Sequence, residues 1–254
     1  QSAATPESVS GFWTGYRRAS AFSSVNYDFK KKYLVTVTAR YDGSSRFGTQ
    51  NQYGLFPSVR VGWSMVEEEF LKNSSTISEM KLRASYGLTG NDQIGNFDAR
   101  GLYGGGGNYS GSAGIVPSSL ANLGLGWETN NTLNLGIDYG FFENRITGSI
   151  DAFDRRTKDL LLSQPILWTN GFSGISNNVG ELQNRGLEFE LSTVNIDKGG
   201  FRWNSSFNIT KIDNQIVSLY SGLKFLPANP GIAVGQPVGR SGEGAWIHQG
   251  IDGN

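Results

Sequence analysis

The sequence predicts an all-β protein, an antiparallel transmembrane β-barrel segment of about nine or ten strands. Apolar and polar residues alternate with a period of two in segment after segment. Most of these segments run for about 9–12 residues, which suits a tilted strand crossing a bilayer better than the roughly 5–6 residues of an ordinary strand. Aromatic residues stand at the ends of the apolar faces, and charged residues stand in the middle of the opposite faces. That distribution is typical of a barrel with lipid outside and water inside.

The clearest alternation lies between Tyr33 and Tyr41. One face carries Tyr33, Val35, Val37, Ala39 and Tyr41, and the other carries Leu34, Thr36, Thr38 and Arg40. The same pattern recurs over 57–64, 80–89, 133–141, 146–152, 187–192 and 201–209. Two less regular strands are expected over about 10–18 and 20–29.

The expected connections are of two lengths. Short turns are expected at Arg18–Ser20, Lys30–Lys32, Phe142–Asn144 and Asp197–Gly199. Long connections rich in Gly, Ser and Asn are expected at 42–52, 90–122 and 157–183, and a single helical turn at Glu67–Leu71. Porin-type barrels show this asymmetry, with short turns on the periplasmic side and long loops outside.

Composition and charge exclude several classes of protein. The chain has 254 residues, 22 Lys and Arg against 22 Asp and Glu, one His and no Cys. A nucleic-acid binder would show a basic excess, and a chain without Cys has no disulfide framework, thiolate metal site or cysteine nucleophile. No apolar run approaches the ~18 residues of a transmembrane helix, which excludes a helical membrane protein but not a barrel. The N-terminal Gln1–Ala4 lacks the charged start and apolar core of a signal peptide, so we expect a processed or internal chain.

No set of residues has the spacing of an active site or a metal site. His248 is the single His, and a Ser-His-Asp triad would have to use it. Asp92 and Asp98 are not spaced like a calcium loop, and no Lys-Ser/Thr pair follows Gly104–Gly107 as it would in a phosphate-binding loop. We therefore predict no enzyme, no cofactor, and no catalytic, cofactor-binding or metal-ligating residue.

Specific strings then narrow the prediction. A strand runs into Asp42-Gly43-Ser44-Ser45-Arg46-Phe47-Gly48. Further blocks follow in order at Gly54–Val59, Gly62-Trp63, Glu68–Leu71, Lys81–Asn91, Trp127-Glu128, Asn144-Arg145, Thr157–Leu161, Asn178–Glu181, Asn184–Glu188 and Gly235–Gly239. In order and spacing, over about residues 10–240, these blocks resemble the SusC/RagA family of TonB-linked outer-membrane transporters. From Arg240 onward the sequence departs from the family pattern.

The resemblance implies import of a large nutrient, such as an oligosaccharide or peptide, across the outer membrane of a Gram-negative, Bacteroidetes-type envelope. The partners it implies are a SusD-like lipoprotein lid, TonB acting through a plug region, outer-membrane lipid and the glycan or peptide cargo, with no nucleic acid. Such transporters have about 22 strands, so residues 1–254 are expected to form one partial barrel domain without the plug and without the C-terminal closing strand. In isolation this segment is expected to be an open curved sheet.

Two groups of residues are candidates for contact with the cargo. The aromatic residues of the long connections, Tyr103, Tyr109, Trp168 and Phe172, lie where ligand contacts concentrate and have faces on which sugar rings stack. Packing of the loops against one another is the alternative role for them. The charged residues in the middle of polar strand faces, Arg40, Arg60, Arg83 and Glu188, are expected to face the lumen. There they would contact substrate or pack against the plug.

A second class of protein also fits the alternation. Soluble β-sandwiches and β-solenoids alternate in the same way. A soluble extracellular β-rich carbohydrate-binding or adhesion module is therefore the alternative interpretation of this sequence.

Overall fold

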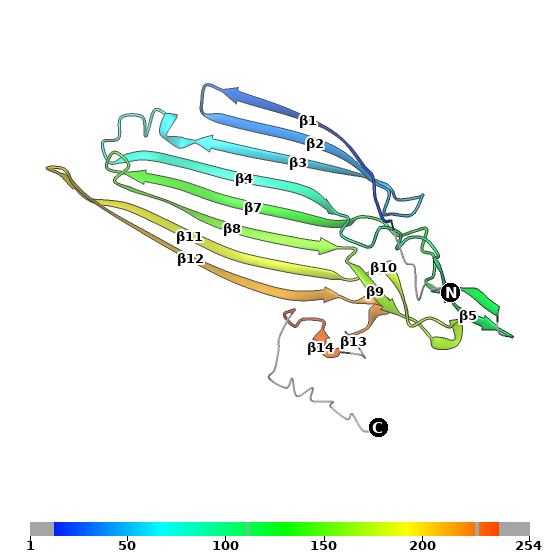
Figure 1. Cartoon of the computed structure of the whole chain (residues 1–254). Coiled ribbons are helices and arrows are strands. Elements are labelled where there is room, and N and C mark those ends of the chain that lie inside the picture. Colours follow the sequence, from blue (N-terminus) through cyan, green and yellow to red (C-terminus); the bar gives the residue numbers. More distant parts are fainter. Residues whose placement is uncertain (1–12, 111, 227–228, 239–254) are drawn as a thin grey trace, which may run out of the picture.

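One open antiparallel sheet dominates the computed structural model, which describes residues 13–110, 112–226 and 229–238 (Figure 1). Its eight strands are, in spatial order, β1 (Arg18–Phe29), β2 (Tyr33–Ser44), β3 (Tyr53–Ser64), β4 (Ile77–Asn91), β7 (Glu128–Phe141), β8 (Ile146–Lys158), β11 (Glu181–Lys198) and β12 (Phe201–Ser218). Every neighbouring pair is antiparallel, which confirms the predicted fold class. Among the described residues β1 and β12 each pair on one side only, so the sheet is not closed.

Three small hairpins and three short 3₁₀ turns complete the described structure. The hairpins are β5 (Tyr103–Tyr109) with β6 (Ser112–Pro117), β9 (Leu161–Pro165) with β10 (Gly174–Asn178), and β13 (Phe225–Leu226) with β14 (Asn229–Ala233). The 3₁₀ turns are η1 (Met65–Glu67), η2 (Trp168–Asn170) and η3 (Tyr220–Gly222). The helical turn expected at Glu67–Leu71 thus begins slightly earlier, as η1. No helix in the described ranges is long and apolar enough to cross a membrane.

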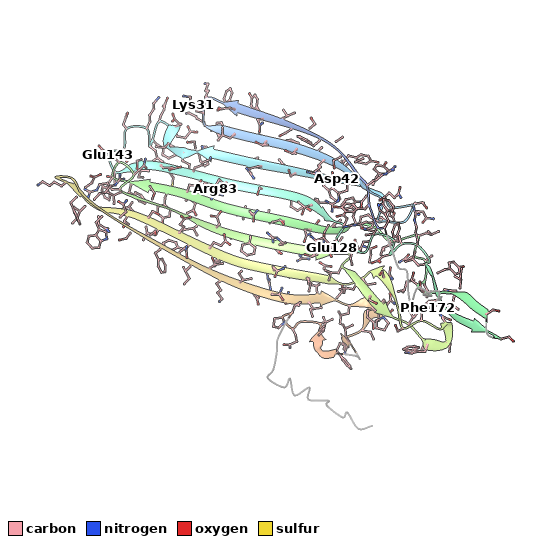
Figure 2. All side chains as sticks on the ribbon, viewed as in Figure 1. Lys31, Asp42, Arg83, Glu128, Glu143 and Phe172 are labelled. Carbon is pink, nitrogen blue, oxygen red and sulfur yellow. The ribbon has the colours of Figure 1, made fainter. Side chains whose placement is uncertain are left out.

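The two ends of the sheet differ. At one end lie the turns at Lys30–Lys32 and Phe142–Asn144, which confirm two predicted turns, and a third turn at Gly199–Gly200. Both glycines of that third turn have positive φ, 63° and 82°, so the hairpin turns slightly later than Asp197–Gly199. At the other end lie the long connections that hold β5, β6, β9 and β10 (Figure 1). Figure 2 shows Lys31 and Glu143 at the short-turn end, and Asp42, Glu128 and Phe172 toward the loop end.

The first predicted turn and the first predicted strand are wrong. Residues 13–17 form no strand, and β1 continues through Arg18–Ser20 because Arg18 is already paired with Ser44 of β2. The segment before β1 is tied to the loop beyond β2 instead. The backbone N–H of Arg17 donates to Ser45 Oγ at 2.8 Å, and the N–H of Ser45 donates to the Arg17 carbonyl at 3.0 Å.

The apolar side chains of the main sheet are exposed on one face rather than buried in a core. Val37, Leu135 and Phe207 are 49%, 51% and 54% exposed. The described residues bury only six hydrophobic side chains, namely Phe47, Phe56, Ala99, Leu125, Ile216 and Leu219. A soluble domain of this size would bury many more. This exposed face, from here on the apolar belt, therefore needs an apolar surrounding.

The edge of the apolar belt steps along the strands. On β2 the belt runs from Tyr33 to Tyr41, whereas on β8 it ends at Ala152, beyond which the same face carries Asp154. The register aligns Ala152, through β7, β4 and β3, with Val35 of β2. Six residues of shift over four strand spacings give about 20 Å along the strand and about 19 Å across, a tilt of about 45°. Strands of membrane barrels are tilted by about 35–45°.

At the short-turn end, Glu68 fastens the β1–β2 turn to the β3–β4 connection. Glu68 Oε2 accepts a hydrogen bond from Lys32 Nζ at 2.9 Å. Its Oε1 accepts from the Trp63 indole N–H at 3.1 Å and from the Tyr33 hydroxyl at 2.9 Å. These bonds, that of Lys32 first, hold the pKa of Glu68 below its ordinary value of 4.5. In turn the Glu68 carboxylate raises the pKa of Lys32 above 10.5.

We expect Glu68→Gln in the intact protein to flatten the acid side of the stability profile. Because the pKa of Glu68 is lower in the folded state, its contribution is present above about pH 4.5 and is lost as the pH falls through the folded pKa. Lys32 has the opposite sign: its contribution is present below about pH 10.5 and is lost as the pH rises through the raised pKa. Thermal unfolding in detergent between pH 7 and pH 3 measures the effect, with the neighbouring Glu69→Gln as control. Identical acid profiles for the wild type and Glu68→Gln would contradict this assignment.

Candidate functional site

The face opposite the apolar belt is mainly polar, although Phe56 and Phe153 also lie on it. Opposed residues of neighbouring strands share a face, and the register places Arg60 between Thr36 and Ser85, and Arg83 opposite Gly62 and Gly136. Arg40 and Glu188 lie on the same face by the same alignment. The four charged residues predicted for the lumen thus share one surface, although contact with a substrate stays a prediction.

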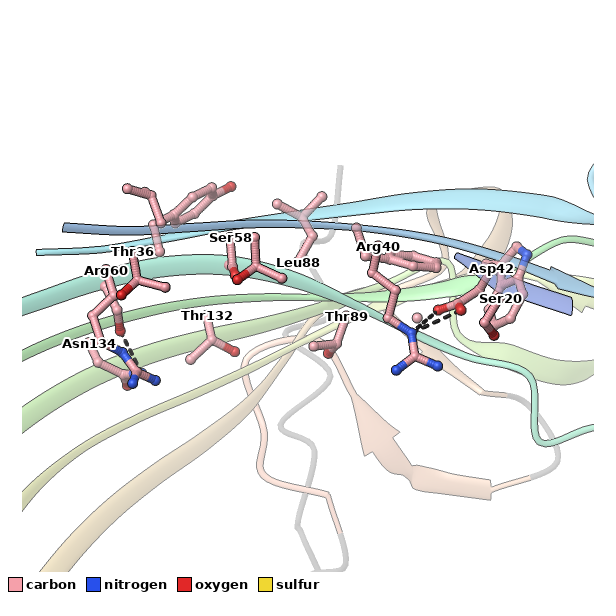
Figure 3. Close-up of a pocket in the computed structure, with 18 of the residues that line it drawn as sticks. Ser20, Thr36, Arg40, Asp42, Ser58, Arg60, Leu88, Thr89, Thr132 and Asn134 are labelled. Carbon is pink, nitrogen blue, oxygen red and sulfur yellow. Dashed lines mark hydrogen bonds and ion pairs between the residues drawn. The ribbon is translucent and has the colours of Figure 1, made fainter. Parts of the chain in front are cut away.

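A trough of about 580 Å³ lies on this polar face, over β1, β2, β3, β4 and β7 and toward the loop end (Figure 3). Its lining includes Arg18, Ser20, Thr36, Thr38, Arg40, Asp42, Ser58, Arg60, Ser85, Thr89, Asp92, Thr132 and Asn134. The volume falls within the roughly 300–1,000 Å³ of ordinary ligand sites. Phe56 and Trp127 also line the trough, so its hydroxyl, amide and guanidinium groups stand beside aromatic rings. This lining suits a polar ligand, and it holds no nucleophile–base pair among the described residues.

Arg40 and Arg60 differ in how they are held in the trough. Arg40 Nε donates to both carboxylate oxygens of Asp42, at 2.9 and 2.6 Å. The terminal Nη groups of Arg40 point away from Asp42 (Figure 3). Arg60 has no ion pair or hydrogen bond within the described residues. Of these two guanidinium groups, that of Arg40 is neutralised and that of Arg60 is not.

Arg83 is pinned by two carboxylates outside the trough. Its Nε and Nη2 donate to Asp138 at 2.8 and 2.7 Å, and Nη2 also donates to Asp151 Oδ2 at 3.1 Å. The group links β4, β7 and β8. Gly136 leaves room for it, because a Cβ there would meet the Asp151 carboxylate and lie 2.9 Å from Arg83 Nη2. Arg83 is thus a structural cross-link of the polar face.

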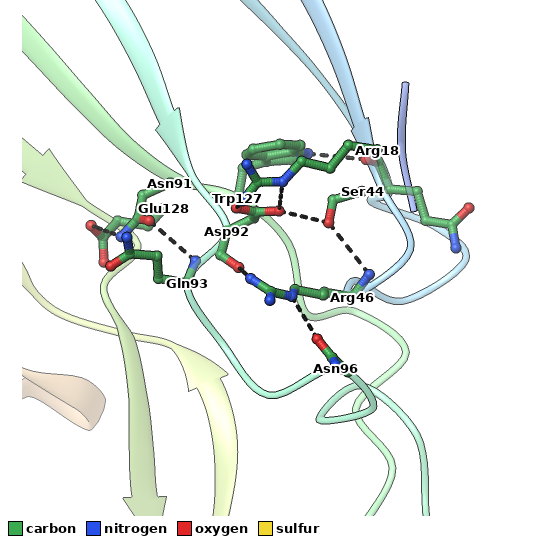
Figure 4. Close-up of polar contacts among 10 residues, drawn as sticks. Arg18, Ser44, Arg46, Asn91, Asp92, Gln93, Asn96, Trp127 and Glu128 are labelled. Carbon is green, nitrogen blue, oxygen red and sulfur yellow. Dashed lines mark hydrogen bonds and ion pairs between the residues drawn. The ribbon is translucent and has the colours of Figure 1, made fainter. Parts of the chain in front are cut away.

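Asp92 organises the loop end of the sheet (Figure 4). It is 3% exposed, just after β4, and its carboxylate accepts from Arg18 Nε at 2.8 Å, from Arg18 Nη2, and from Ser44 Oγ at 2.8 Å. Arg46 donates to the Asp92 carbonyl and to Asn96 Oδ1, both at 3.0 Å. One carboxylate therefore joins β1, the end of β2 and the β4–β7 connection.

A small apolar cluster lies beside Asp92. Phe47, Ala99 and Leu125 are buried together, with Trp127 packed against them. The Trp127 ring lies 5.0 Å from that of Phe47 and 5.3 Å from that of Phe56, and its indole N–H donates to the Gln52 carbonyl at 3.1 Å. The long connections are therefore fixed by a core of their own rather than free.

The candidate loop aromatics do not share one environment. Tyr103 and Trp168 are 72% and 76% exposed, on β5 and η2. Phe172 is half-buried beyond η2. Tyr109 is the last residue of β5, and its side chain lies outside the described part of the structure. Contact of these residues with a cargo stays a prediction.

Glu188 and His248 are the remaining residues singled out from the sequence, and Glu188 is part of no catalytic or metal site among the described residues. Glu188 is exposed on β11, opposite Asp151 and Thr210. His248 lies outside the described residues. Within the described ranges no three His, Cys, Asp or Glu side chains come together as a metal site requires.

Sequence reasoning missed the partners of the arginines. Asp138 and Asp151 lie within the alternating segments 133–141 and 146–152, but only the register between strands brings them to Arg83. Asp92 directly follows a family-like block, but alternation carries no signal for its contact with Arg18, 74 residues earlier.

We expect Asp92→Asn in the intact protein to loosen the β4–β7 connection. The neutral amide weakens two charged hydrogen bonds from Arg18, so the loop opens more often and trypsin cuts after the exposed Arg100 about tenfold faster. Mass spectrometry of timed digests measures the rate. Asp98→Asn is the matched control, because Asp98 accepts only a local bond from the Gly95 N–H at 2.9 Å. Equal cleavage of the wild type and Asp92→Asn would show that Asp92 does not hold the loop.

Comparison with known proteins agrees with this geometry. Residues 2–241 match the family described as "TonB dependent receptor-like, beta-barrel". The chain is 40% identical over 206 residues to TonB-dependent receptor P39 of Formosa agariphila, and 40% identical over 211 residues to TonB-dependent receptor SusC of Bacteroides thetaiotaomicron. These matches cover 81% and 80% of this chain but 20% and 21% of the relatives, so the chain spans about a fifth of their length.

Solved structures give the same result. The sheet superimposes on the structure of the RagAB peptide transporter with a TM-score of 0.81 at 31% identity, over 87% of this chain and 25% of that chain. The RagAB peptide importer in its "open-open" state matches with the same values. With the exposed apolar belt, the polar face and the two unlike ends of the sheet, these matches show that the chain belongs to the β-barrel family of TonB-dependent receptors and is of the SusC/RagA type.

Proposed function

We propose that the full-length protein imports a large nutrient, such as an oligosaccharide or a peptide, across the outer membrane. The observation that carries the proposal is the division of one sheet into an exposed apolar belt and a charged, hydroxyl-rich face, in a chain of the TonB-dependent receptor family. The belt suits the hydrocarbon layer, and the polar face suits a water-filled passage.

The described strands supply only part of such a barrel. The outer edges of β1 and β12 would leave unpaired N–H and C=O groups in lipid, at a cost of several kcal/mol each. Further strands of the full-length protein are therefore proposed to pair with both edges and close a barrel of about 22 strands. Residues 1–254 form one partial barrel domain in this proposal, without plug or closing strand.

The partners in this proposal follow from the relatives. The RagAB structures and the SusC relative support a lipoprotein lid at the loop end, and the family supports coupling to TonB through a plug. The location proposed is the outer membrane of a Bacteroidetes-type envelope. The cargo is a glycan or a peptide, and the loop aromatics Tyr103, Tyr109, Trp168 and Phe172 are proposed to contact it.

A pair of lysine substitutions tests the membrane location. Phe207 lies in the apolar belt and is 54% exposed, and the adjacent Asn208 lies on the polar face. In the full-length protein, Phe207→Lys should cost about 2–4 kcal/mol and reduce the amount of assembled barrel, whereas Asn208→Lys should be tolerated. The readout is folded protein in isolated outer membranes. A soluble module would tolerate both changes, since both side chains would face water. Full-length protein that stays soluble without detergent would also contradict the proposal.

Uptake tests the transport itself. Cells that carry the full-length protein should accumulate labelled oligosaccharides or labelled oligopeptides, and deletion of the protein should abolish accumulation of at least one of the two probes. Removing TonB or adding a protonophore should have the same effect as deletion. Unchanged accumulation of both probes after deletion would contradict import by this protein.

A further inference from the structure

We propose that the trough on the polar face binds acidic oligosaccharides, with Arg60 as the anchor for a carboxylate or sulfate group and Arg40 as a second contact. This inference rests on the proposed function and names the cargo class for that surface. It is carried by the charge, spacing and lining of the trough.

The charge of the trough is positive. Its lining holds three guanidinium groups, on Arg18, Arg40 and Arg60, against two carboxylates, on Asp42 and Asp92. Arg18 pairs with Asp92 and Arg40 with Asp42, so Arg60 remains as the surplus cation. An anionic ligand would restore neutrality, with a charge-assisted bond to a guanidinium that has no protein partner in the described ranges.

The spacing of the two arginines suits an extended ligand. Arg40 is opposite Phe56 in the register, and Arg60 lies four residues further along β3. The two Cα atoms are therefore about 13 Å apart along the strand direction and about 5 Å apart across it. Both guanidinium groups point to the same side of the sheet (Figure 3). A chain of several acidic units can reach both, whereas a single small anion can reach only one.

Hydroxyl and amide groups fill the interval between the two arginines. Thr38 and Ser58 form one register pair there, and Thr132 is aligned with them through Gly87 of β4. Asn134 and Ser85 lie beside Arg60, where the Asn134 amide donates to Ser85 Oγ at 3.4 Å, a long bond that a ligand could replace. These groups both donate and accept hydrogen bonds, as sugar hydroxyls require.

The position of the trough favours an oligosaccharide over a peptide. Extended peptides commonly bind by adding a strand to a free sheet edge, through backbone hydrogen bonds. The trough lies on the face of β1, β2, β3, β4 and β7, and the strands that carry Arg40 and Arg60, β2 and β3, have neighbours on both sides. A ligand between Arg40 and Arg60 therefore meets side-chain hydroxyls rather than the unpaired backbone groups of a free edge.

Binding to the purified full-length protein in detergent tests the proposal. The probes are hexagalacturonate, which carries a carboxylate on each sugar, the neutral cellohexaose, and a hexaglutamate peptide. We expect the wild type to bind hexagalacturonate at least about tenfold more tightly than cellohexaose, because only the acidic sugar offers a charge-assisted hydrogen bond to Arg60. Hexaglutamate carries the same charges without sugar hydroxyls, so it should bind more weakly than hexagalacturonate if the hydroxyl and amide lining contributes. Arg60→Gln should remove about tenfold of the affinity for hexagalacturonate, and Arg60→Lys should restore part of it. Lys81→Gln is the matched control, since it removes one positive charge from the same face outside the trough.

Several results would overturn the inference. Equal affinity for the acidic and neutral sugars, or an affinity unchanged by Arg60→Gln, would show that the trough does not select anions. Preference for hexaglutamate would show that the ligand is a peptide. A loss of thermal stability in Arg60→Gln with unchanged hexagalacturonate binding would show that Arg60 contacts another part of the protein. If binding depends on Arg60 but no TonB-dependent uptake is seen, the trough assignment stands and the transport function is refuted. If uptake is seen but binding does not depend on Arg60, the transport function stands and the trough assignment is refuted.

Discussion

The pairing of backbone N–H and C=O groups between neighbouring strands is the constraint on which the rest of this structure depends. In a hydrocarbon layer no water can satisfy an unpaired peptide group, so the strands must be long, continuous and antiparallel. Once the backbone is satisfied within the sheet, the side chains are free to face two different surroundings. This is why the described residues have only a small buried core, at the loop end, and an apolar surface that is exposed along the whole sheet.

The arginine side chains of the polar face are not buried, and several of them are neutralised by oppositely charged neighbours. Arg83 is matched by Asp138 and Asp151 from the next two strands, and Arg40 by Asp42 on its own strand. These groups are partly exposed, so each pair contributes little to stability by itself. Their main effect is to fix the directions of the guanidinium groups. Arg60 has no such partner among the described residues, as is also true of Arg155 and Lys81 on the same face, but of these three only Arg60 lines the trough.

Most of the fold could be predicted from local sequence patterns. The features that could not be predicted depend on contacts between residues far apart in the sequence. Alternation placed Arg40, Arg60 and Arg83 on one face, because a period of two follows directly from strand geometry. The strand predicted over about 10–18 failed because the path of the chain before β1 is decided by Ser45, far away in the sequence. The hairpins within the long connections were also missed, since glycine-rich stretches such as Gly104–Gly107 resemble open loops.

The role of the family-like strings became visible only in three dimensions. Phe47 and Trp127 belong to blocks 80 residues apart in the chain, yet their rings meet in the small core beside Asp92. The trough likewise combines five strands, and it lies where side chains are short or absent, as at Ser58 and Gly87. Neither the Phe47–Trp127 contact nor the trough could be predicted from the pattern within one segment.

The linkage of Asp92 to Arg18 and Ser44 also bears on the order of assembly. Asp92 binds Arg18, 74 residues earlier, and Ser44, 48 residues earlier. These hydrogen bonds can form only after β1, β2, β3 and β4 have taken their places in the sheet. Contacts of such sequence separation form late, because the intervening chain must lose its freedom first. The indole of Trp127, which packs against Phe47 and is partly buried only when that end is complete, should therefore change its fluorescence late in the assembly of this part of the sheet.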